Sequence, residues 1–125
     1  MNLLLDTSAL LWWLAEDPGL SPGARRAIAS PANTAWVSAA TSWEISTKVA
    51  LGKLRFDREL PAVVEANGFR PLGLSLEHCW AAGNLPRHHG DPFDRMLIAQ
   101  ALTEGLTIVT RDRHFRAYGV PVLDA

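Results

Sequence analysis

The sequence is poor in cysteine and in net charge, and each shortage excludes a class of protein. Cys79 is the only cysteine among 125 residues, so an internal disulfide and a cage of thiolate metal ligands are both excluded. A chain without disulfides fits a reducing compartment, and we expect the protein to be cytoplasmic. The formal net charge of −1 gives no global sign of nucleic-acid binding, although ten of the twelve basic residues are arginines, which bind phosphates through a fork of donors.

Long apolar runs are missing as well. No stretch reaches the roughly 18 uninterrupted apolar residues that a membrane span needs, so we expect no membrane partner. The opening 15 residues are apolar, but they lack a basic leading segment and carry Asp6, which is atypical of an export signal. With 48% hydrophobic residues and no repeats, the composition predicts one globular domain over residues 1–125.

The hydrophobic pattern predicts strands that alternate with helices. Apolar and β-branched runs predict strands at 2–5, 34–38, 72–74, 106–110 and 120–124. Helical spacing and capping residues predict helices at 7–15, 21–30, 39–51, 59–66, 76–82, 92–104 and 113–117. This alternation is typical of an α/β fold with three α/β/α layers and a mostly parallel central sheet. Four further side chains are expected in the core: Trp36, Trp43, Cys79 and Trp80.

Four acids fall near the carboxyl ends of the predicted strands. Asp6 directly follows the first strand, and Asp112 comes two residues after the strand at 106–110. Asp94 begins the helix that leads into that strand, and Glu44 lies in the helix after the second strand. Ligands bind parallel sheets at the carboxyl ends of the strands, so we expect these acids to share one edge.

Each acid also has a local explanation. Asp6 and Asp112 could cap the helices that follow them, and Glu44 could pair with Lys48 one turn on. Capping and pairing give no reason for the acids to gather at one edge, whereas a hard divalent cation does, because clustered carboxylates repel unless they are neutralised. Magnesium prefers such oxygen ligands, and the predicted chemistry is metal-assisted hydrolysis of a phosphate ester.

Two aspartates compete for the roles of helix cap and metal ligand in the stretch HHGDPFDR. Asp91 suits the N-cap, with Pro92 at the first helical position, and Asp94 suits either a capping box or a metal. His88 and His89 raise a zinc alternative, but adjacent loop residues seldom bind one ion together, and no third nitrogen or sulfur ligand is present nearby. A contact to substrate phosphate and a solvated loop are the other interpretations of these histidines.

Three longer stretches occur in an order typical of one family. They are LLLDTSALLWWL at 3–14, VSAATSWEISTKVALGKL at 37–54 and LPRHHGDPFDRMLIAQALTEGLTIVTRDRHF at 85–115. With these motifs the chain resembles the PIN-domain nucleases, and closely the VapC toxins of bacterial and archaeal toxin–antitoxin pairs. The resemblance extends over essentially the whole chain and implies a single PIN domain over residues 1–125.

The resemblance also implies a site and an activity. Asp6, Glu44 and Asp94 look like the metal-binding acids of the family, and Asp112 looks like its fourth, more variable acid. Asp94 is preferred to Asp91 because it keeps the family's spacing to the small residues of the helix. The implied activity is that of an endoribonuclease toxin that uses Mg²⁺ or Mn²⁺ to cut structured RNA such as transfer RNA. The implied partners are the RNA substrate, a VapB-type antitoxin and a second copy of the chain in a homodimer.

Three alternatives to this function are open from the sequence. A PIN-like domain could act only as a catalytically silent binding protein, or the substrate could be single-stranded DNA. A receiver-like signalling domain needs an acid after the middle strand, and the strand at 34–38, taken as the middle one, ends in Ser38. Four arginines near the acids could either hold RNA phosphates or balance the acidic charge: Arg87, Arg95, Arg111 and Arg113.

Overall fold

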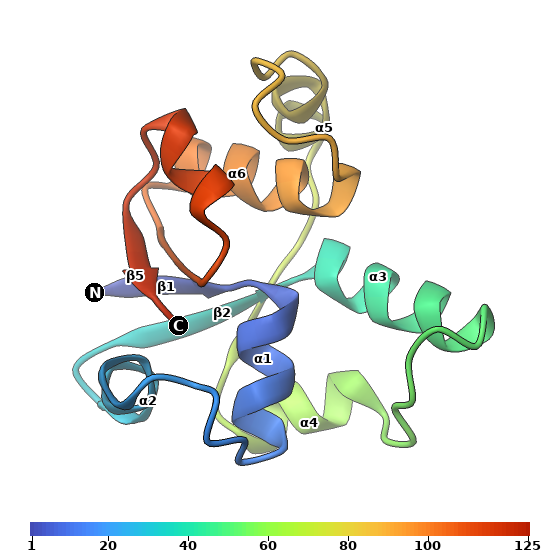
Figure 1. Cartoon of the computed structure of the whole chain (residues 1–125), viewed down its shortest axis with the longest axis vertical. Coiled ribbons are helices and arrows are strands. Elements are labelled where there is room, and N and C mark those ends of the chain that lie inside the picture. The colour runs from blue at the N-terminus through green and yellow to red at the C-terminus, as the bar shows by residue number, and fades with distance from the viewer.

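Short apolar runs form a five-stranded sheet in the computed structural model, which describes residues 1–125 (Figure 1). The strands lie in the order β3-β2-β1-β4-β5, and every neighbouring pair is parallel. Their bounds are β1 (Asn2–Leu5), β2 (Thr34–Ser38), β3 (Arg70–Leu72), β4 (Thr107–Thr110) and β5 (Val122–Asp124). The predicted α/β class with a parallel sheet is confirmed.

Helices fill the connections between the strands. Figure 1 shows α5, α6 and η1 on one side of the sheet, α1, α2 and α4 on the other, and α3 projecting beyond the end of β2. None of them combines the length and the apolar character that a membrane crossing needs. Their bounds are α1 (Thr7–Leu14), α2 (Pro22–Ala29), α3 (Ala39–Ala50), α4 (Leu60–Ala66), α5 (Leu76–Gly83), α6 (Pro92–Glu104) and the 3₁₀ helix η1 (Arg113–Tyr118).

The central strand β1 contributes to two cores at once. Leu3 and Leu5 pack with the helices of one face, whereas Leu4 packs with α6 and η1 on the other. Successive strand residues point to opposite faces of a sheet, so a strand that is covered on both sides is apolar at every position. The uninterrupted run of leucines before Asp6 is therefore the local reason that β1 lies in the middle of the sheet.

The predicted limits of three strands need correction. β4 begins at Thr107 and β5 at Val122, one and two residues later than predicted. The strand predicted at 72–74 lies instead at Arg70–Leu72 and contains Pro71. Proline is tolerated there because β3 is an edge strand, where a missing N–H donor costs little.

Three of the expected core residues are exposed. Trp43 and Trp80 keep 63% and 79% of their surface accessible, and Cys79 is exposed as well. On α5 the inward positions are taken by His78 and Ala82, so the residues between them face outward. The aromatic character of Trp43 in α3 and of Trp80 in α5 therefore predicted the wrong face of each helix.

The loop between α5 and α6 is fastened by one guanidinium group. Arg95 Nη1 donates to the carbonyl oxygens of Pro86 (3.0 Å) and His89 (3.2 Å). Its Nη2 donates to the carbonyl oxygens of Ala82 and Leu85, both at 3.0 Å. These donors are thus occupied within the chain, and Arg95 fastens the loop instead of taking either role that the sequence left open, holding phosphates or balancing the acidic charge.

We expect Arg95→Ala to lower the free energy of unfolding by about 2–3 kcal/mol, because it leaves several carbonyl groups without their donor. Urea unfolding measures the change. Arg87→Ala, at an exposed position of the same loop, is the matched control and should change stability by less than about 0.5 kcal/mol. Equal effects of the two variants would contradict the fastening role of Arg95.

Candidate active site

The parallel sheet brings the carboxyl ends of β1 and β4 to one edge, where the predicted acids meet. Asp6 follows β1, and its backbone N–H donates to the carbonyl of Val109 in β4 at 3.1 Å. Glu44 reaches the same edge from α3 and Asp94 from α6, two helices that pack together. With Asp112 they line one cleft of about 350 Å³. The structure therefore brings all four predicted acids together.

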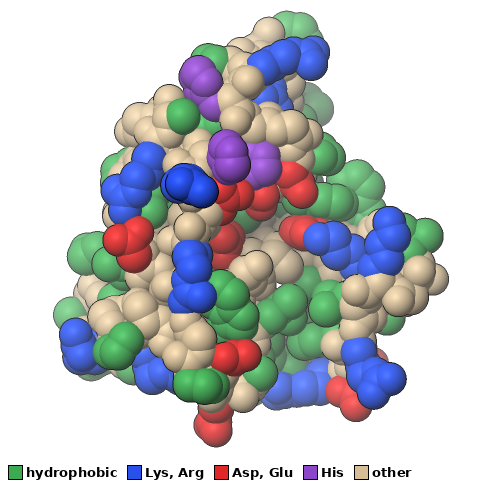
Figure 2. Space-filling view, viewed as in Figure 1, with side chains coloured by type: hydrophobic (Ala, Val, Ile, Leu, Met, Phe, Trp, Pro, Cys, Tyr) green, Lys and Arg blue, Asp and Glu red, His purple; other side chains and the backbone are tan.

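The cleft combines this acidic floor with cationic walls. Figure 2 shows acidic side chains in a hollow below a group of histidines, with Lys and Arg side chains around it. Lys48, Lys53 and Arg111 line the cleft, as do the hydroxyl residues Thr7 and Ser8. A groove with such a distribution can accept a polyanion along its walls while it holds a cation at its floor.

Three of the aspartates at the cleft are helix caps as well. Asp6 accepts from the backbone N–H of Ala9 (2.8 Å) and caps α1, while Asp112 accepts from that of His114 (2.9 Å) and caps η1. Asp91 caps α6, as predicted. Asp6 and Asp112 therefore cap helices and line the cleft at the same time, so the local explanation of each acid does not exclude a role in the site.

The start of α6 separates the roles of its two aspartates. Asp91 Oδ1 accepts from the backbone N–H of Phe93 (2.8 Å) and of Asp94 (3.1 Å). In a capping box Asp94 would accept from the backbone N–H of Asp91 in return, but that N–H donates to Nδ1 of His89 (3.2 Å). The Asp94 carboxylate is therefore free of capping and faces the cleft.

Glu44 is buried, with 5% of its surface exposed, and both its carboxylate oxygens are held. Thr7 Oγ1 donates to Oε1 at 2.6 Å, and Lys48 Nζ pairs with Oε2 at 2.5 Å. The hydrogen bond to Glu44 raises the pKa of Lys48, which keeps the ammonium charged. The pair expected one turn apart is present, but its acid lies in the cleft and not on a solvated helix face.

The acids of the cleft differ in proton affinity. Burial raises the pKa of Asp6, and it raises that of Asp94 to about 7, where the charge of Asp91 adds to the effect. Burial also acts to raise the pKa of Asp112, but hydrogen bonds from His114 and His89 outweigh it and lower that pKa. Two carboxylates at the site thus resist ionisation in the absence of a counter-charge.

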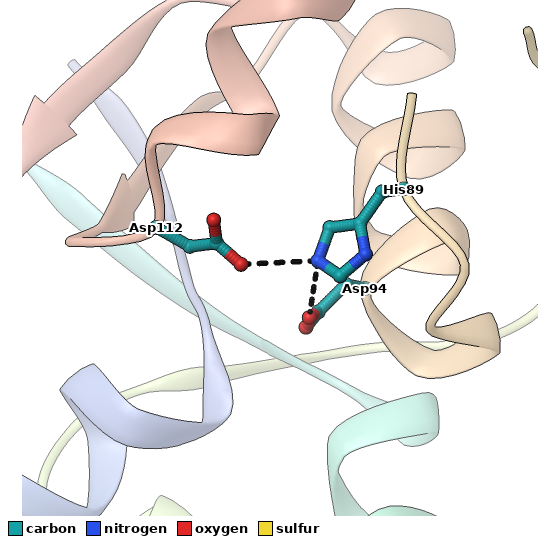
Figure 3. Close-up of side chains that lie close together, drawn as sticks. All are labelled: His89, Asp94 and Asp112. Carbon is teal, nitrogen blue, oxygen red and sulfur yellow. Dashed lines mark hydrogen bonds and ion pairs between the residues drawn. The ribbon is translucent and has the colours of Figure 1, made fainter. Parts of the chain in front are cut away.

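His89 contacts two of the acids, a role that the sequence did not predict for it. Its Nε2 lies 3.0 Å from Oδ2 of Asp94 and 3.0 Å from Oδ2 of Asp112 (Figure 3). One ligand atom from each of these three residues lies within 4.8 Å of the others. His88 is not part of this group and packs against Tyr118 at 5.1 Å between ring centroids, so the structure does not group both histidines with Asp91 as the zinc alternative requires.

The donor set fits a hard divalent cation. Four carboxylates converge, two of them with raised pKa values, and burial keeps water from dispersing their charge. Carboxylate oxygens are the ligands that magnesium and manganese prefer in proteins. A cation at this edge of the sheet would supply the missing counter-charge.

Comparison with known proteins assigns the family. The model of the PIN domain matches residues 3–121. The chain belongs to the PIN-domain family. Its sequence is 31% identical over 128 residues to Ribonuclease VapC22 of Mycobacterium tuberculosis, covering 96% of this chain and 94% of the relative.

Solved structures share the fold of this PIN domain. DNA-bound VapBC from Salmonella typhimurium matches with a TM-score of 0.70 at 21% identity, over 99% of this chain and 98% of that one. VapBC2 from Rickettsia felis, bound to a promoter DNA fragment, matches with a TM-score of 0.69 at 14% identity, over 98% of both chains. At 21% and 14% identity, this similarity shows a shared fold and nothing about function.

Family membership removes the receiver-like alternative, although one argument against it was wrong. The middle strand of this PIN domain is β1 and not β2, so an acid, Asp6, does follow the middle strand.

The raised pKa of Asp94 makes the stability of the metal-free protein depend on pH. The folded state keeps this proton up to about pH 7, whereas an unfolded aspartate loses it near its ordinary value of 3.8. Because the folded state binds more protons between these values, Asp94 lowers the free energy of unfolding as the pH rises through that range. The lowered pKa of Asp112 affects the free energy of unfolding only below this pH range.

We therefore expect Asp94→Asn to be more stable than the unchanged chain in EDTA, by a margin that widens from about pH 5 to about pH 8. Urea unfolding at the two pH values measures the margin. A constant margin would contradict the raised pKa.

Proposed function

We propose that this PIN domain, spanning residues 1–125, is a divalent-cation-dependent endoribonuclease and the toxin of a toxin–antitoxin pair. The observation that carries the proposal is the convergence of Asp6, Glu44, Asp94 and Asp112 in one cleft. These acids come from four separate segments of the chain, so no local capping rule accounts for their meeting. The ribonuclease name of the 31% identical relative supports the choice of RNA.

The four acids would hold Mg²⁺ or Mn²⁺. When bound, such an ion neutralises the carboxylates and polarises the scissile phosphodiester. Thr7 and Lys48 hold the two oxygens of the Glu44 carboxylate, which fixes the orientation of this ligand. Capping holds Asp6 at the end of β1 in the same way.

Cationic side chains on the cleft walls would position the RNA backbone. Lys53 is exposed there, and Arg111 stacks over the ring of Trp12, with its guanidinium carbon 4.3 Å from the ring centroid. Arg111 also donates from Nε and Nη2 to the carbonyl of Ala125, at 3.1 and 2.9 Å, and from Nη2 to that of Gly19. These contacts fix the side chain beside the acids and leave Nη1 as the donor for a phosphate. Phosphate contacts of this kind set the register of a nucleic acid without reading its sequence.

The proposed substrate is structured RNA such as transfer RNA, and the proposed setting is the cytoplasm. The proposed partners are a VapB-type antitoxin and a second copy of the chain in a homodimer. Two of the proteins that share the fold are VapBC complexes, which supports a partner of the antitoxin type.

We expect Asp6→Asn to lower the rate at which a total transfer-RNA pool is cleaved by at least about 100-fold, while the fold persists. Asparagine removes the charge at Asp6 but is as good an N-cap as aspartate, so α1 keeps its cap. Fragment analysis with Mg²⁺, with Mn²⁺ and with EDTA measures the activity, and circular dichroism checks the fold.

Asp124→Asn is the matched control, because Asp124 is an exposed acid whose side chain pairs only with Arg116. It should cleave as the unchanged chain does. Equal cleavage by Asp6→Asn and the unchanged chain would refute the site. No cleavage of transfer RNA, ribosomal RNA or single-stranded DNA by the metal-loaded, unchanged chain would favour a silent binding protein.

A further inference from the structure

We propose that His89 is a positioning residue: its Nε2 donates a proton to Asp112 and lies 3.0 Å from Asp94, so that the ring bridges the two carboxylates and sets their separation without itself binding the metal. The proposal rests on the proposed function in one respect, because it takes the two carboxylates to be metal ligands. What it adds is a role for a side chain that is not one of the four acids.

The backbone of Asp91 decides which ring nitrogen of His89 carries the proton. The Asp91 N–H points at Nδ1 at 3.2 Å, and a backbone N–H can only donate. Nδ1 therefore presents its lone pair, which places the proton of the neutral ring on Nε2. Nε2 in turn faces one oxygen each of Asp94 and Asp112, both at 3.0 Å.

A protonated Nε2 has no lone pair left for a metal ion. To bind an ion, the ring would have to move its proton to Nδ1, where it would oppose the N–H of Asp91. The environment of His89 thus favours a hydrogen-bond donor to metal ligands over a third ligand of its own, although His89, Asp94 and Asp112 lie close enough to share an ion.

The ring of His89 is held in this orientation from several sides. Its backbone N–H donates to the hydroxyl of Tyr118 at 2.8 Å, and its carbonyl accepts from Arg95 at 3.2 Å. The ring packs edge-on against the buried Phe115, with ring centroids 5.9 Å apart at 76°. Its side chain is 15% exposed, so little room is left for it to turn away from the acids.

The bridge links α6 to η1 at the cleft, beside a second link in which Arg95 of α6 donates to the hydroxyl of Tyr118 in η1 at 3.4 Å. Asp94 lies in the first turn of α6, and Asp112 caps η1. Asp112 Oδ1 already accepts from the backbone N–H and from the ring of His114, at 2.9 and 2.8 Å, whereas Oδ1 of Asp94 accepts no hydrogen bond. The bridge therefore fixes the separation of the two acids and leaves an oxygen of Asp94 open towards a cation.

Two amide substitutions separate the donor at Nε2 from the rest of the ring. In His89→Gln the amide nitrogen reaches the place of Nε2 and can still donate to Asp112 while it lies beside Asp94. In His89→Asn the shorter side chain reaches only the place of Nδ1, so the bridge is lost. His88→Asn, at the exposed neighbouring position, is the control for a change of histidine in this loop.

Calorimetric titration of the purified chain with Mn²⁺, without RNA, measures the effect. We expect His89→Asn to weaken Mn²⁺ binding by about 10- to 100-fold, the range typical of groups that orient metal ligands. His89→Gln should restore most of the affinity, and His88→Asn should leave it unchanged. Equal losses in His89→Gln and His89→Asn, or no loss in either, would overturn the proposal, as would absence of Mn²⁺ binding by the unchanged chain.

Nitrogen NMR of the unchanged chain tests the proposal without any substitution that could disturb folding. We expect the Nε2–H form of His89 both in EDTA and after loading with Mg²⁺. A proton on Nδ1, or loss of the Nε2 proton on loading with the ion, would make His89 a ligand and overturn the proposal. Neither measurement uses cleavage, so an inactive chain that passes both would refute the proposed function and leave the role of His89 standing.

Discussion

Mutual repulsion of four carboxylates is the constraint around which this PIN domain is arranged. Each acid is met by donors that offset part of its charge: backbone N–H groups at Asp6, a hydroxyl and an ammonium at Glu44, and imidazole rings at Asp112. Asp94 has only the imidazole of His89, and its pKa is raised to about 7. The unevenness of this compensation leaves the site short of positive charge, which a cation can supply.

The central sheet stabilises the edge at which the four carboxylates meet. β1 lies at the centre of five parallel strands and is buried on both faces, so the position at its carboxyl end is fixed by two cores at once. Hydrophobic burial of that extent stabilises the fold in spite of the strained acidic edge. Burial of β1 therefore stabilises the position of Asp6, while the fastened loop that carries His89 positions Asp94 and Asp112.

Local patterns were enough to predict the helices, most of the strands and all four acids, because runs of leucine, capping residues and acids after strands are read within a few residues. Features that depend on distant packing were missed. His89 gains its role only because the fold places the start of η1 beside the start of α6. Its partner Asp112 lies 23 residues further along the chain. Trp43 and Trp80 face outward because other residues of their helices occupy the positions that face the core. The carbonyl groups that Arg95 binds are likewise brought together only by the fold.

The double use of Asp6 has an evolutionary consequence. Because its carboxylate both faces the cleft and caps α1, replacement by alanine would remove charge and cap together, whereas asparagine removes only the charge. Aspartate and asparagine codons differ by a single G-to-A transition in the first position. With the role proposed for Asp6, a folded but inert form of the domain lies one base change from the active one, and a lineage released from selection for cleavage would retain a domain able to serve as a binding scaffold.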